Sequence, residues 1–459
     1  MKFDNNAITL LSYAQEALDV FSQAHIEAWI VGGFVRDALL GQSCNDIDIA
    51  AQCPWEYTKE IFEHAGWKTH ETGIAHGTLT IIKDKHAIEV TTYRNDGAYA
   101  SDARHPKQVT FVNTIEEDLA RRDFTINALA YHPDHGILDL YGGISDLKSG
   151  IIRAVGNPEK RFSEDALRIL RGCRFAAQLG FSIEPHTYQA MIHHKGLLAK
   201  IAVERVTSEL DKLLVAPFAG DAILENVDVL SVVLPELVAL KNFDQQTPYH
   251  IYDVLTHTCK ALDAAPATRR LRWATLCHDM GKPATFFQDD TGRGHFYGHP
   301  AVSAFIARGI LSRLLFEKAE RERIVTLIQL HDITIPATPK GVCKLLHRLN
   351  DDVDLFRELL ELKRADTTAQ APCYNRTPQI DEVASILTNV LEAKEPFSLA
   401  HLPITGHDML ALGIPKGPRV GEALDFALQQ VLDDVFPNER EALLEAINRW
   451  WQDMLIVGN

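Results

Sequence analysis

Two aspartates separated by one residue, Asp46 and Asp48, stand in the short apolar segment DIDIA. Alternate side chains of a β-strand share a face, so this spacing places both carboxylates on the same side. Carboxylate oxygens bind hard cations such as Mg²⁺, and a pair of metal ions can activate an attacking hydroxyl and stabilise a leaving pyrophosphate. Taken alone, such a pair is more often a solvated strand face. Glu89, on another predicted strand, can add a third carboxylate or can equally be structural.

Two glycines, Gly32 and Gly33, lie between a predicted strand and a predicted helix. Because they lack a Cβ, they let backbone N–H groups approach a triphosphate closely, and a helix N-terminus favours an anion. Arg36 can add a positive charge. A lone glycine pair is usually a turn, so the functional interpretation depends on the ordered set of glycines, arginine and paired aspartates.

A second group of charged residues lies in the segment RRDFTINALA, which we predict to be helical. Arg121 and Arg122 can neutralise triphosphate charge. Asp123 can accept a hydrogen bond from a ribose hydroxyl, which would select ribonucleotides. The alternative is a helix with ordinary surface charges.

A third segment, KRFSEDALRILRGCRFAAQLGF, contains Asp165 and Arg168 three residues apart in a predicted helix. Residues at this spacing share a helix face, and their commonest role is an intrahelical ion pair. However, cytosine and adenine each present an amino donor beside a ring-nitrogen acceptor, which a carboxylate and a guanidinium can recognise. Guanine and uracil would leave both protein groups unpaired, which is costly in a buried site. One Asp–Arg pair can therefore accept C and A and reject G and U.

Together, these segments resemble a known enzyme family. GGFVRDALLG, DIDIA and RRDFTIN resemble the polymerase-beta-type nucleotidyltransferase superfamily, in its tRNA nucleotidyltransferase and bacterial poly(A) polymerase branch. EDALR resembles the EDxxR motif of class II tRNA nucleotidyltransferases, which acts as a protein template for the incoming base. The resemblance implies addition of C, C and then A to the 3′ end of tRNA from CTP and ATP, with Mg²⁺ as cofactor. The catalytic residues that it implies are Asp46, Asp48 and Glu89, and the nucleotide-binding residues are Gly32, Gly33, Arg36, Arg121, Arg122, Asp123, Asn127, Glu164, Asp165, Arg168, Arg171 and Arg174.

Two related activities stay open as alternatives: addition of A alone, and synthesis of poly(A). The sequence around EDALR is more similar to the CCA branch than to the poly(A) branch. In this family the loop corresponding to residues 93–111 is implicated in the switch from C to A addition. Its complete length favours an enzyme that can add A, but does not separate full CCA addition from A addition alone.

A set of histidines and aspartates in the second half of the chain has the residue types of a divalent transition-metal site. The order of these residues resembles that of HD-type metal phosphohydrolases, a domain that some bacterial tRNA nucleotidyltransferases carry. By this resemblance the metal ligands are His257, His278, Asp279 and Asp366, with His299 and His331 as candidates for a second metal or for phosphate and His250 as a weaker one. A degenerate domain that only packs against tRNA is an alternative, and so is a protein that is mainly a phosphohydrolase.

A glycine-rich turn near the C-terminus carries Lys416 and Arg419. Such a turn can expose backbone N–H groups to a phosphate, and the two side chains add charge. The stretch resembles the tail of bacterial CCA-adding enzymes, which grips tRNA, so Lys416 and Arg419 are candidate tRNA contacts. A plain linker between helices is the alternative.

The order of the expected strands and helices, together with the resemblance, predicts an α/β nucleotidyltransferase domain of the polymerase-beta type followed by all-α domains. We expect strands at 28–31, 46–50, 77–83 and 87–93, and helices at 1–25, 34–40, 114–130 and 161–179. The predicted domains are a catalytic domain at 1–145, a helical nucleotide- and RNA-binding domain at 146–240, an HD-type metal domain at 241–371 and a helical tRNA-binding tail at 372–459.

The composition limits the cellular setting and the type of nucleic-acid contact. The net charge of −16 means that any contact with nucleic acid must be local to a face or cleft. Seven cysteines without a CxxC pair argue against a zinc ribbon or a disulfide scaffold and fit a reducing compartment. We find neither a signal peptide nor an apolar run long enough to span a membrane, so we expect a cytoplasmic protein. The sequence leaves the oligomeric state open.

Overall fold

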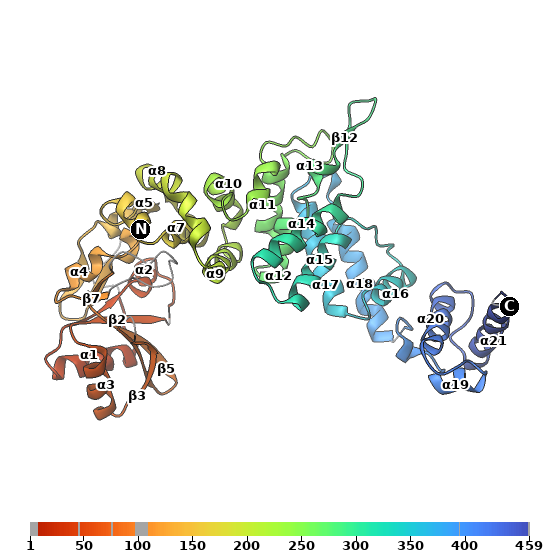
Figure 1. Cartoon of the computed structure of the whole chain (residues 1–459), viewed down its shortest axis with the longest axis horizontal. Coiled ribbons are helices and arrows are strands. Elements are labelled where there is room, and N and C mark those ends of the chain that lie inside the picture. The colour runs from red at the N-terminus through yellow and green to blue at the C-terminus, as the bar shows by residue number, and fades with distance from the viewer. Residues whose placement is uncertain (1–7, 45, 75–76, 97–108, 394, 458–459) are drawn as a thin grey trace. The chain divides into compact units, whose positions relative to one another are not determined.

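The computed structural model describes residues 8–44, 46–74, 77–96, 109–393 and 395–457. The chain divides into two compact units, which Figure 1 shows in the warm and the cool colours of the bar. Unit 1 comprises residues 1–238 with 313–315, and unit 2 comprises residues 239–312 with 316–459. The α/β fold that we expected lies in unit 1, and its second half and unit 2 are mostly helical, so the predicted fold class is confirmed.

A seven-stranded mixed sheet forms the N-terminal part of unit 1, with the strand order β3-β4-β5-β2-β1-β8-β9. Neighbouring strands are antiparallel except for β2 and β5, which are parallel. The strands are β1 (Ala28–Val31), β2 (Ile47–Ala51), β3 (Lys68–Gly73), β4 (Thr78–Lys83), β5 (His86–Thr92), β8 (Leu129–His132) and β9 (Gly136–Asp139). The helices of this part are α1 (Ser12–Gln23), α2 (Gly33–Leu39), α3 (Trp55–His64) and α4 (Ile115–Ala120).

The sequence located the central strands of this sheet to within about a residue. Strand β1 has the predicted bounds, and β2 starts one residue later than predicted, so that Asp46 immediately precedes it. Asp84 and Lys85 make the expected turn between β4 and β5, with φ angles of 49° and 72°. Within the loop that we expected at 93–111, Arg94–Asp96 form β6, which pairs with β7 (Val109–Phe111). Most of the loop to which we attributed the switch from C to A, residues 97–108, lies outside the described residues.

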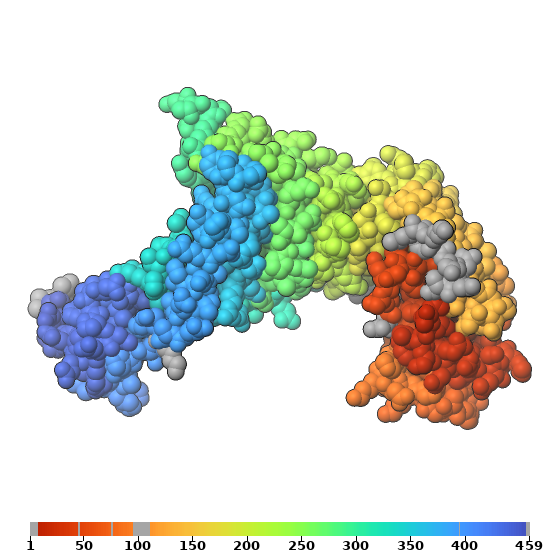
Figure 2. Space-filling model, turned by 180° about the vertical axis from the view of Figure 1, so that it is seen from behind, coloured from red at the N-terminus to blue at the C-terminus, as the bar shows by residue number. Residues whose placement is uncertain are grey.

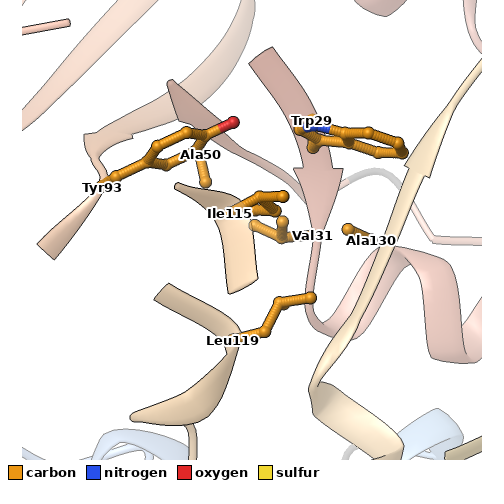
Figure 3. Packing of buried hydrophobic residues seen from close by; sticks show 7 residues of the cluster. All are labelled: Trp29, Val31, Ala50, Tyr93, Ile115, Leu119 and Ala130. Atoms are coloured by element: carbon orange, nitrogen blue, oxygen red, sulfur yellow. The ribbon is translucent and has the colours of Figure 1, made fainter. Parts of the chain in front are cut away.

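A buried cluster on the sheet holds α4 in place, and Figure 3 shows its side chains. Ile115 and Leu119 of α4 pack against Trp29 and Val31 of β1, with Ala50, Tyr93 and Ala130 completing the cluster. Burial of such side chains stabilises the fold by about 1.5–3 kcal/mol each. The packing therefore fixes the helix from which the arginine-rich segment starts.

The prediction of a helix over 114–130 is wrong beyond Ala120. After α4 the chain turns at Arg121, forms a single 3₁₀ turn at Thr125–Asn127 and enters β8. Local side-chain hydrogen bonds compete with the helix here. The Asp123 carboxylate accepts a bond from the N–H of Phe124 at 2.8 Å, and the Thr125 hydroxyl donates to Asp146 at 2.7 Å.

The second half of unit 1 is helical. The predicted helix over 161–179 is two helices, α6 (Pro158–Glu164) and α7 (Leu167–Leu179), because Asp165 adopts an extended conformation between them. Its carboxylate accepts a hydrogen bond from the N–H of Leu167 and so caps α7. Gly180 ends α7 in the left-handed conformation. The remaining helices are α5 (Gly143–Ser149), α8 (Pro185–His194), α9 (Val203–Leu214) and α10 (Ala219–Leu230).

Unit 2 is a helical unit with one short hairpin, β12 (Phe287–Gln288) and β13 (Gly294–His295), which stands out from its surface (Figures 1 and 2). Helices α11 and α12 pack on α17, and α12 also packs on α15. The helices are α11 (Val254–Ala264), α12 (Arg269–Cys277), α13 (Lys282–Thr285), α14 (His299–Arg313), α15 (Lys318–Leu330), α16 (Pro339–Arg348), α17 (Val353–Thr368), α18 (Thr377–Ala393), α19 (Gly406–Ala411), α20 (Pro418–Leu432) and α21 (Arg440–Val457). Among the helices of the described residues, none combines the length and the apolar character needed to cross a membrane.

Candidate functional site

Three carboxylates meet where β1, β2 and β5 lie side by side. Asp48 on β2 pairs in register with Val31 on one side and with Glu89 on the other, and Asp46 precedes the same strand. Burial raises the pKa of Asp48, and the negative charges of Asp46 and Glu89 add to this effect more than the nearby Arg122 opposes it, so that the pKa is about 6. A cation would relieve this repulsion, so the residues fit a site for Mg²⁺.

The glycine pair lies directly beside these carboxylates. Gly32 has a φ of 75° and a ψ of −131°, a conformation that strongly favours glycine. A Cβ at Gly32 would lie 3.1 Å from a guanidinium nitrogen of Arg122 and 3.8 Å from a carboxylate oxygen of Asp48. Gly33 begins α2 as expected. Gly32, Arg122 and Asp48 therefore lie side by side, although they come from different parts of the sequence.

Carboxylates hold the arginines of this site in fixed orientations. Arg121 and Arg122 both bond to Asp118 on α4, at 2.8 Å and 3.1 Å. Burial would raise the pKa of Asp118, but the two guanidinium groups outweigh it and hold the pKa below its ordinary value. We did not single out Asp118 from the sequence, although its spacing from Arg122 is that of an ion pair on a helix.

Arg36 is positioned in a similar way. It pairs with Asp37 through two hydrogen bonds, at 2.7 Å and 2.9 Å, and donates to the side-chain oxygen of Asn127 at 2.7 Å. Its guanidinium also lies over the ring of Phe175, 5.3 Å from the centroid. The expected positive charge is therefore adjacent to the glycines and partly neutralised by Asp37.

Asp123 forms the centre of a second buried network. Its carboxylate pairs with Arg171 at 2.6 Å and accepts a bond from the amide of Asn127 at 3.3 Å. Burial opposes ionisation, but Arg171 and the hydrogen bonds lower the pKa of Asp123 to about 2. The group is thus an anion that can accept a further hydrogen bond.

Asp165 and Arg168 have different partners, so the intrahelical ion pair that we considered as the alternative is not what holds them. Arg168 bonds to Glu164 at 3.0 Å and to the carbonyl oxygens of Arg161 and Arg121 at 3.2 Å and 2.8 Å. Asp165 accepts a bond from Arg205 at 3.1 Å. Asp165 and Arg168 are therefore oriented by other residues, Arg205 and Glu164, and not by each other.

Arg174, the last arginine of the predicted set, lies one turn beyond Arg171 on α7. It pairs with Glu209 of α9 at 2.6 Å, and its guanidinium lies 4.1 Å from the centroid of the Phe175 ring. These contacts join α7 to α9. Neither Glu209 nor Phe175 was identified from the sequence.

In unit 2, the predicted histidines and aspartates converge on one buried point. The Nε2 atom of His257 lies 3.0 Å from Asp366 and 3.4 Å from Asp279, and the Nε2 atom of His278 lies 3.2 Å from Asp279. The Nε2 atoms of His299 and His331 are 3.1 Å apart on the other side of Asp279. His278 and Asp279 directly follow the last residue of α12.

The other ring nitrogens show that these histidines are oriented for a ligand. The Nδ1 atoms of His257, His278, His299 and His331 each lie 2.7–3.3 Å from a backbone carbonyl oxygen, so that every Nε2 faces the cluster. Such bonds from the second ring nitrogen to the backbone are typical of metal-binding histidines. The atoms of His257, His278 and Asp366, and those of His278, Asp279 and His331, are close enough to bind a common ion. The buried residues fit a divalent transition metal.

A lysine that we did not predict completes the cluster. The Nζ atom of Lys282 lies 2.7 Å from Asp279 and 3.5 Å from the Nε2 atom of His250, and the Lys282 side chain is buried. Burial, and after it the Lys282 charge, lowers the pKa of His250 to about 3. The cluster borders two cavities of about 660 Å³ and 450 Å³, each lined by His250, His331 and Asp366.

The glycine-rich turn near the C-terminus joins α19 to α20. Gly413 and Gly417 have φ angles of 80° and 137°, and Pro418 begins α20. Lys416 and Arg419 are both exposed, and Arg419 bonds to Glu422 one turn later at 2.5 Å.

Comparison with known protein families covers most of the chain. Four families match: "Poly A polymerase head domain" at 28–153, "Probable RNA and SrmB- binding site of polymerase A" at 180–240, "HD domain" at 249–371 and "tRNA nucleotidyltransferase domain 2" at 351–447. These matches describe the chain as a sequence of domains but do not fix the boundaries that we predicted, which stay predictions.

Individual proteins resemble the chain along different lengths. The CCA-adding enzyme of Streptococcus mutans is 51% identical over 212 residues, but this match spans only about half of each protein, 46% of this chain and 52% of that one. The CCA-adding enzyme of Lactobacillus johnsonii is 33% identical over 445 residues, 97% of this chain and 98% of that one. The crystal structure of the Bacillus stearothermophilus CCA-adding enzyme in complex with CTP is 30% identical and covers 97% of this chain and 99% of that one, with a TM-score of 0.71. Because two of these matches extend along nearly the whole chain, the protein belongs to the bacterial class II CCA-adding enzymes, the tRNA nucleotidyltransferases with a poly(A) polymerase head, an RNA-binding domain and an HD domain.

Proposed function

We propose that the protein adds C, C and A in turn to the 3′ end of tRNA, using CTP and ATP and releasing pyrophosphate. The observation that carries this proposal is the group of three carboxylates around Asp48, which lies beside Gly32 and Arg122. A triphosphate needs such a combination of carboxylates, closely approachable backbone and guanidinium groups.

In the proposed reaction, the tRNA 3′ hydroxyl attacks the α-phosphate in line with the departing pyrophosphate. Mg²⁺ held by Asp46 and Asp48, with Glu89 near them, would lower the pKa of the hydroxyl and neutralise charge on the phosphates. Arg122 donates to the triphosphate from the Gly32 side, and Asp118 keeps its guanidinium in place. Asp123 accepts a hydrogen bond from the ribose.

Base selection is assigned to Asp165 and Arg168. Asp165 accepts a hydrogen bond from the exocyclic amino group of C or A, and Arg168 donates to the adjacent ring nitrogen. Their bonds to Arg205 and Glu164 support this role, because a discriminating donor and acceptor must be held in fixed orientations. Lys416 and Arg419 are proposed as contacts to tRNA phosphates. The proposal includes a cytoplasmic location, since all seven cysteines are free thiols.

The test is incorporation of labelled CTP and ATP, separately and together, into tRNAs that end before the first C, after CC, or after CCA. The expected result is ordered addition of C, C and A followed by a stop. Addition of A only to the CC-ending tRNA would make the protein an A-adding enzyme, and unlimited A addition would make it a poly(A) polymerase. A chain that incorporates neither nucleotide would refute the proposal.

A second activity is favoured by the histidine cluster of unit 2. We propose that this cluster binds a divalent transition metal and hydrolyses phosphate esters. Four imidazoles with their Nδ1 atoms bonded to the backbone, together with Asp279 and Asp366, supply more ligands than a single structural ion requires. The two cavities leave room for a substrate.

This second activity can be tested separately from the first. His278→Ala should lose most of the bound metal, measured by elemental analysis of the purified full chain, and should lose phosphatase activity. Labelled CTP and ATP incorporation should change less than about twofold, because the cluster lies in unit 2 and the carboxylates in unit 1. Full metal content in the His278→Ala variant would refute the assignment of the ligands.

A further inference from the structure

Two histidines and a glutamate of unit 1 converge on the surface, apart from the residues to which a role was assigned above. His193 and His194 lie in the last turn of α8, and Glu159 lies in the first turn of α6. The Nδ1 atom of His193 and the Nε2 atom of His194 lie 2.8 Å and 2.7 Å from the same carboxylate oxygen of Glu159. Two imidazoles and a carboxylate directed at one point have the composition of a metal site.

The convergence of the two rings is not the ordinary arrangement for neighbours on a helix. Successive helical residues point about 100° apart, so their side chains normally diverge. The ring centroids of His193 and His194 are nevertheless only 4.8 Å apart, and the rings reach the carboxylate through different nitrogens. Because α6 packs directly against α8, a second element supplies the third ligand.

The three ligand atoms are close enough to share one ion, since they lie within 4.8 Å of one another. A tetrahedral Zn²⁺ with ligands at about 2.0–2.1 Å holds its ligand atoms about 3.3 Å apart. The carboxylate oxygen and the two nitrogens would therefore separate by roughly 0.5 Å on binding. The side chains can make this movement, because that of His193 is 72% exposed and that of Glu159 is 43% exposed.

The donor set indicates which ion the site would take. Imidazole nitrogens favour divalent transition metals, whereas Mg²⁺ prefers oxygen ligands. This chemistry distinguishes the group from Asp46 and Asp48, which offer only carboxylates. The group also lies in unit 1, whereas the histidine cluster described above lies in unit 2.

We propose that Glu159, His193 and His194 bind a divalent transition metal such as Zn²⁺, which joins α6 to the end of α8. Water would complete the coordination on the exposed side. The last residue of α6 is Glu164, which bonds to Arg168 at 3.0 Å. An ion at the first turn of α6 would therefore restrain the helix that orients Arg168. The inference rests on neither activity proposed above.

The first experiment counts bound Zn²⁺ by elemental analysis of the full chain. The metal-free protein is dialysed against about 10 µM free Zn²⁺, with excess Mg²⁺ to compete at the carboxylates of Asp46 and Asp48. Loss of a ligand should weaken the site at least about tenfold, so His193→Ala and Glu159→Gln should each retain about one Zn²⁺ fewer per chain than the wild type. The unit 2 cluster is unchanged in every variant, so its ions cancel in the comparison.

His186→Ala is the matched control, because His186 is an exposed histidine on the same helix and is not one of the three ligands. It should bind as much Zn²⁺ as the wild type. Equal Zn²⁺ content in the wild type and His193→Ala would overturn the proposal, and so would a difference that appears only at millimolar Zn²⁺.

Hydrogen exchange measured by mass spectrometry locates the ion on the chain. Zn²⁺ should slow amide exchange in residues 158–164 and 185–194 at least about threefold in the wild type and in His186→Ala, because an ion that joins two helices opposes their local opening. In His193→Ala the same segments should change less than about 1.5-fold. Exchange in these segments that Zn²⁺ leaves unaltered in the wild type would overturn the proposal.

Discussion

Asp48→Asn is the substitution that most directly examines the carboxylate cluster. At pH 7.5 and without Mg²⁺, the ionised Asp48 is destabilising, because burial and the charges of Asp46 and Glu89 raise its pKa to about 6 from an ordinary value of 3.8. A difference of this size corresponds to at most about 3 kcal/mol. Partial exposure and counterions reduce it, so we expect asparagine to raise the free energy of unfolding by about 1–2 kcal/mol.

The pH dependence fixes the sign of this effect. Since the pKa of Asp48 is higher in the folded than in the unfolded chain, the folded state binds more protons between pH 3.8 and about 6. The contribution of Asp48 to stability is therefore fully present below pH 3.8 and is lost as the pH rises through 6. The advantage of Asp48→Asn should appear at pH 7.5 and vanish near pH 4, and added Mg²⁺ should reduce it by binding only the wild type well.

Denaturant unfolding of the full chain at pH 4.5 and 7.5, with EDTA or Mg²⁺, measures these differences, and labelled CTP incorporation measures activity. The variant should lose more than about 100-fold in incorporation while gaining stability in EDTA. Asp84→Asn is a suitable control, because Asp84 lies in the β4–β5 turn at a φ of 49°, which asparagine also adopts. An Asp48→Asn chain that retains incorporation, or is less stable than wild type in EDTA at pH 7.5, would refute the reasoning.

Three further variants examine the rest of the proposed transferase site. Gly32→Ala should raise the KM for CTP about tenfold or more, because the new Cβ would crowd Arg122. Gly41→Ala is the control, since Gly41 has a similar φ of 71° and its Cβ would have nothing within 4 Å. It should lower the free energy of unfolding by the roughly 1–2 kcal/mol of backbone strain and leave the KM for CTP unchanged. Asp165→Ala should lower CTP and ATP incorporation about 10- to 100-fold and reduce the preference for them over GTP and UTP, measured by single-nucleotide incorporation; unchanged selectivity would exclude Asp165 as a base reader. Lys416→Ala combined with Arg419→Ala should raise the KM for tRNA and weaken its salt dependence without altering the KM for CTP, and an unaltered salt dependence would remove both residues from the phosphate contacts.

The local sequence pattern was sufficient to predict a strand or helix where the pattern lies within that single element. The apolar alternation around Asp48 and the glycines after β1 located strands β1 and β2 to within a residue. The pattern failed where side chains compete with the backbone, as at Asp123 and at Asp165, each of which accepts a nearby backbone N–H and interrupts a predicted helix. Helix periodicity carries no information about such competition.

The sequence analysis also failed to predict contacts between residues that are distant in the sequence. Glu209 binds Arg174 across 35 residues, and Arg205 binds Asp165 across 40 residues. Asp165 and Arg168 were predicted as a pair, yet each is held by a third residue. Such contacts follow from packing, and the spacing of charges along one helix cannot reveal them.

The pairing of the site's arginines is compatible both with a net charge of −16 and with the polyanionic substrates that we propose. Arg121 and Arg122 share Asp118, and Arg171 has Asp123, so these guanidinium groups are ordered before a nucleotide arrives. Preordered donors reduce the entropy lost on binding, but their paired charge attracts a triphosphate less over long distances. Nucleotide affinity should then depend mainly on Mg²⁺ and on short-range donors near Asp48. It follows that the KM for CTP should respond strongly to Mg²⁺ and only weakly to monovalent salt, in contrast to the KM for tRNA.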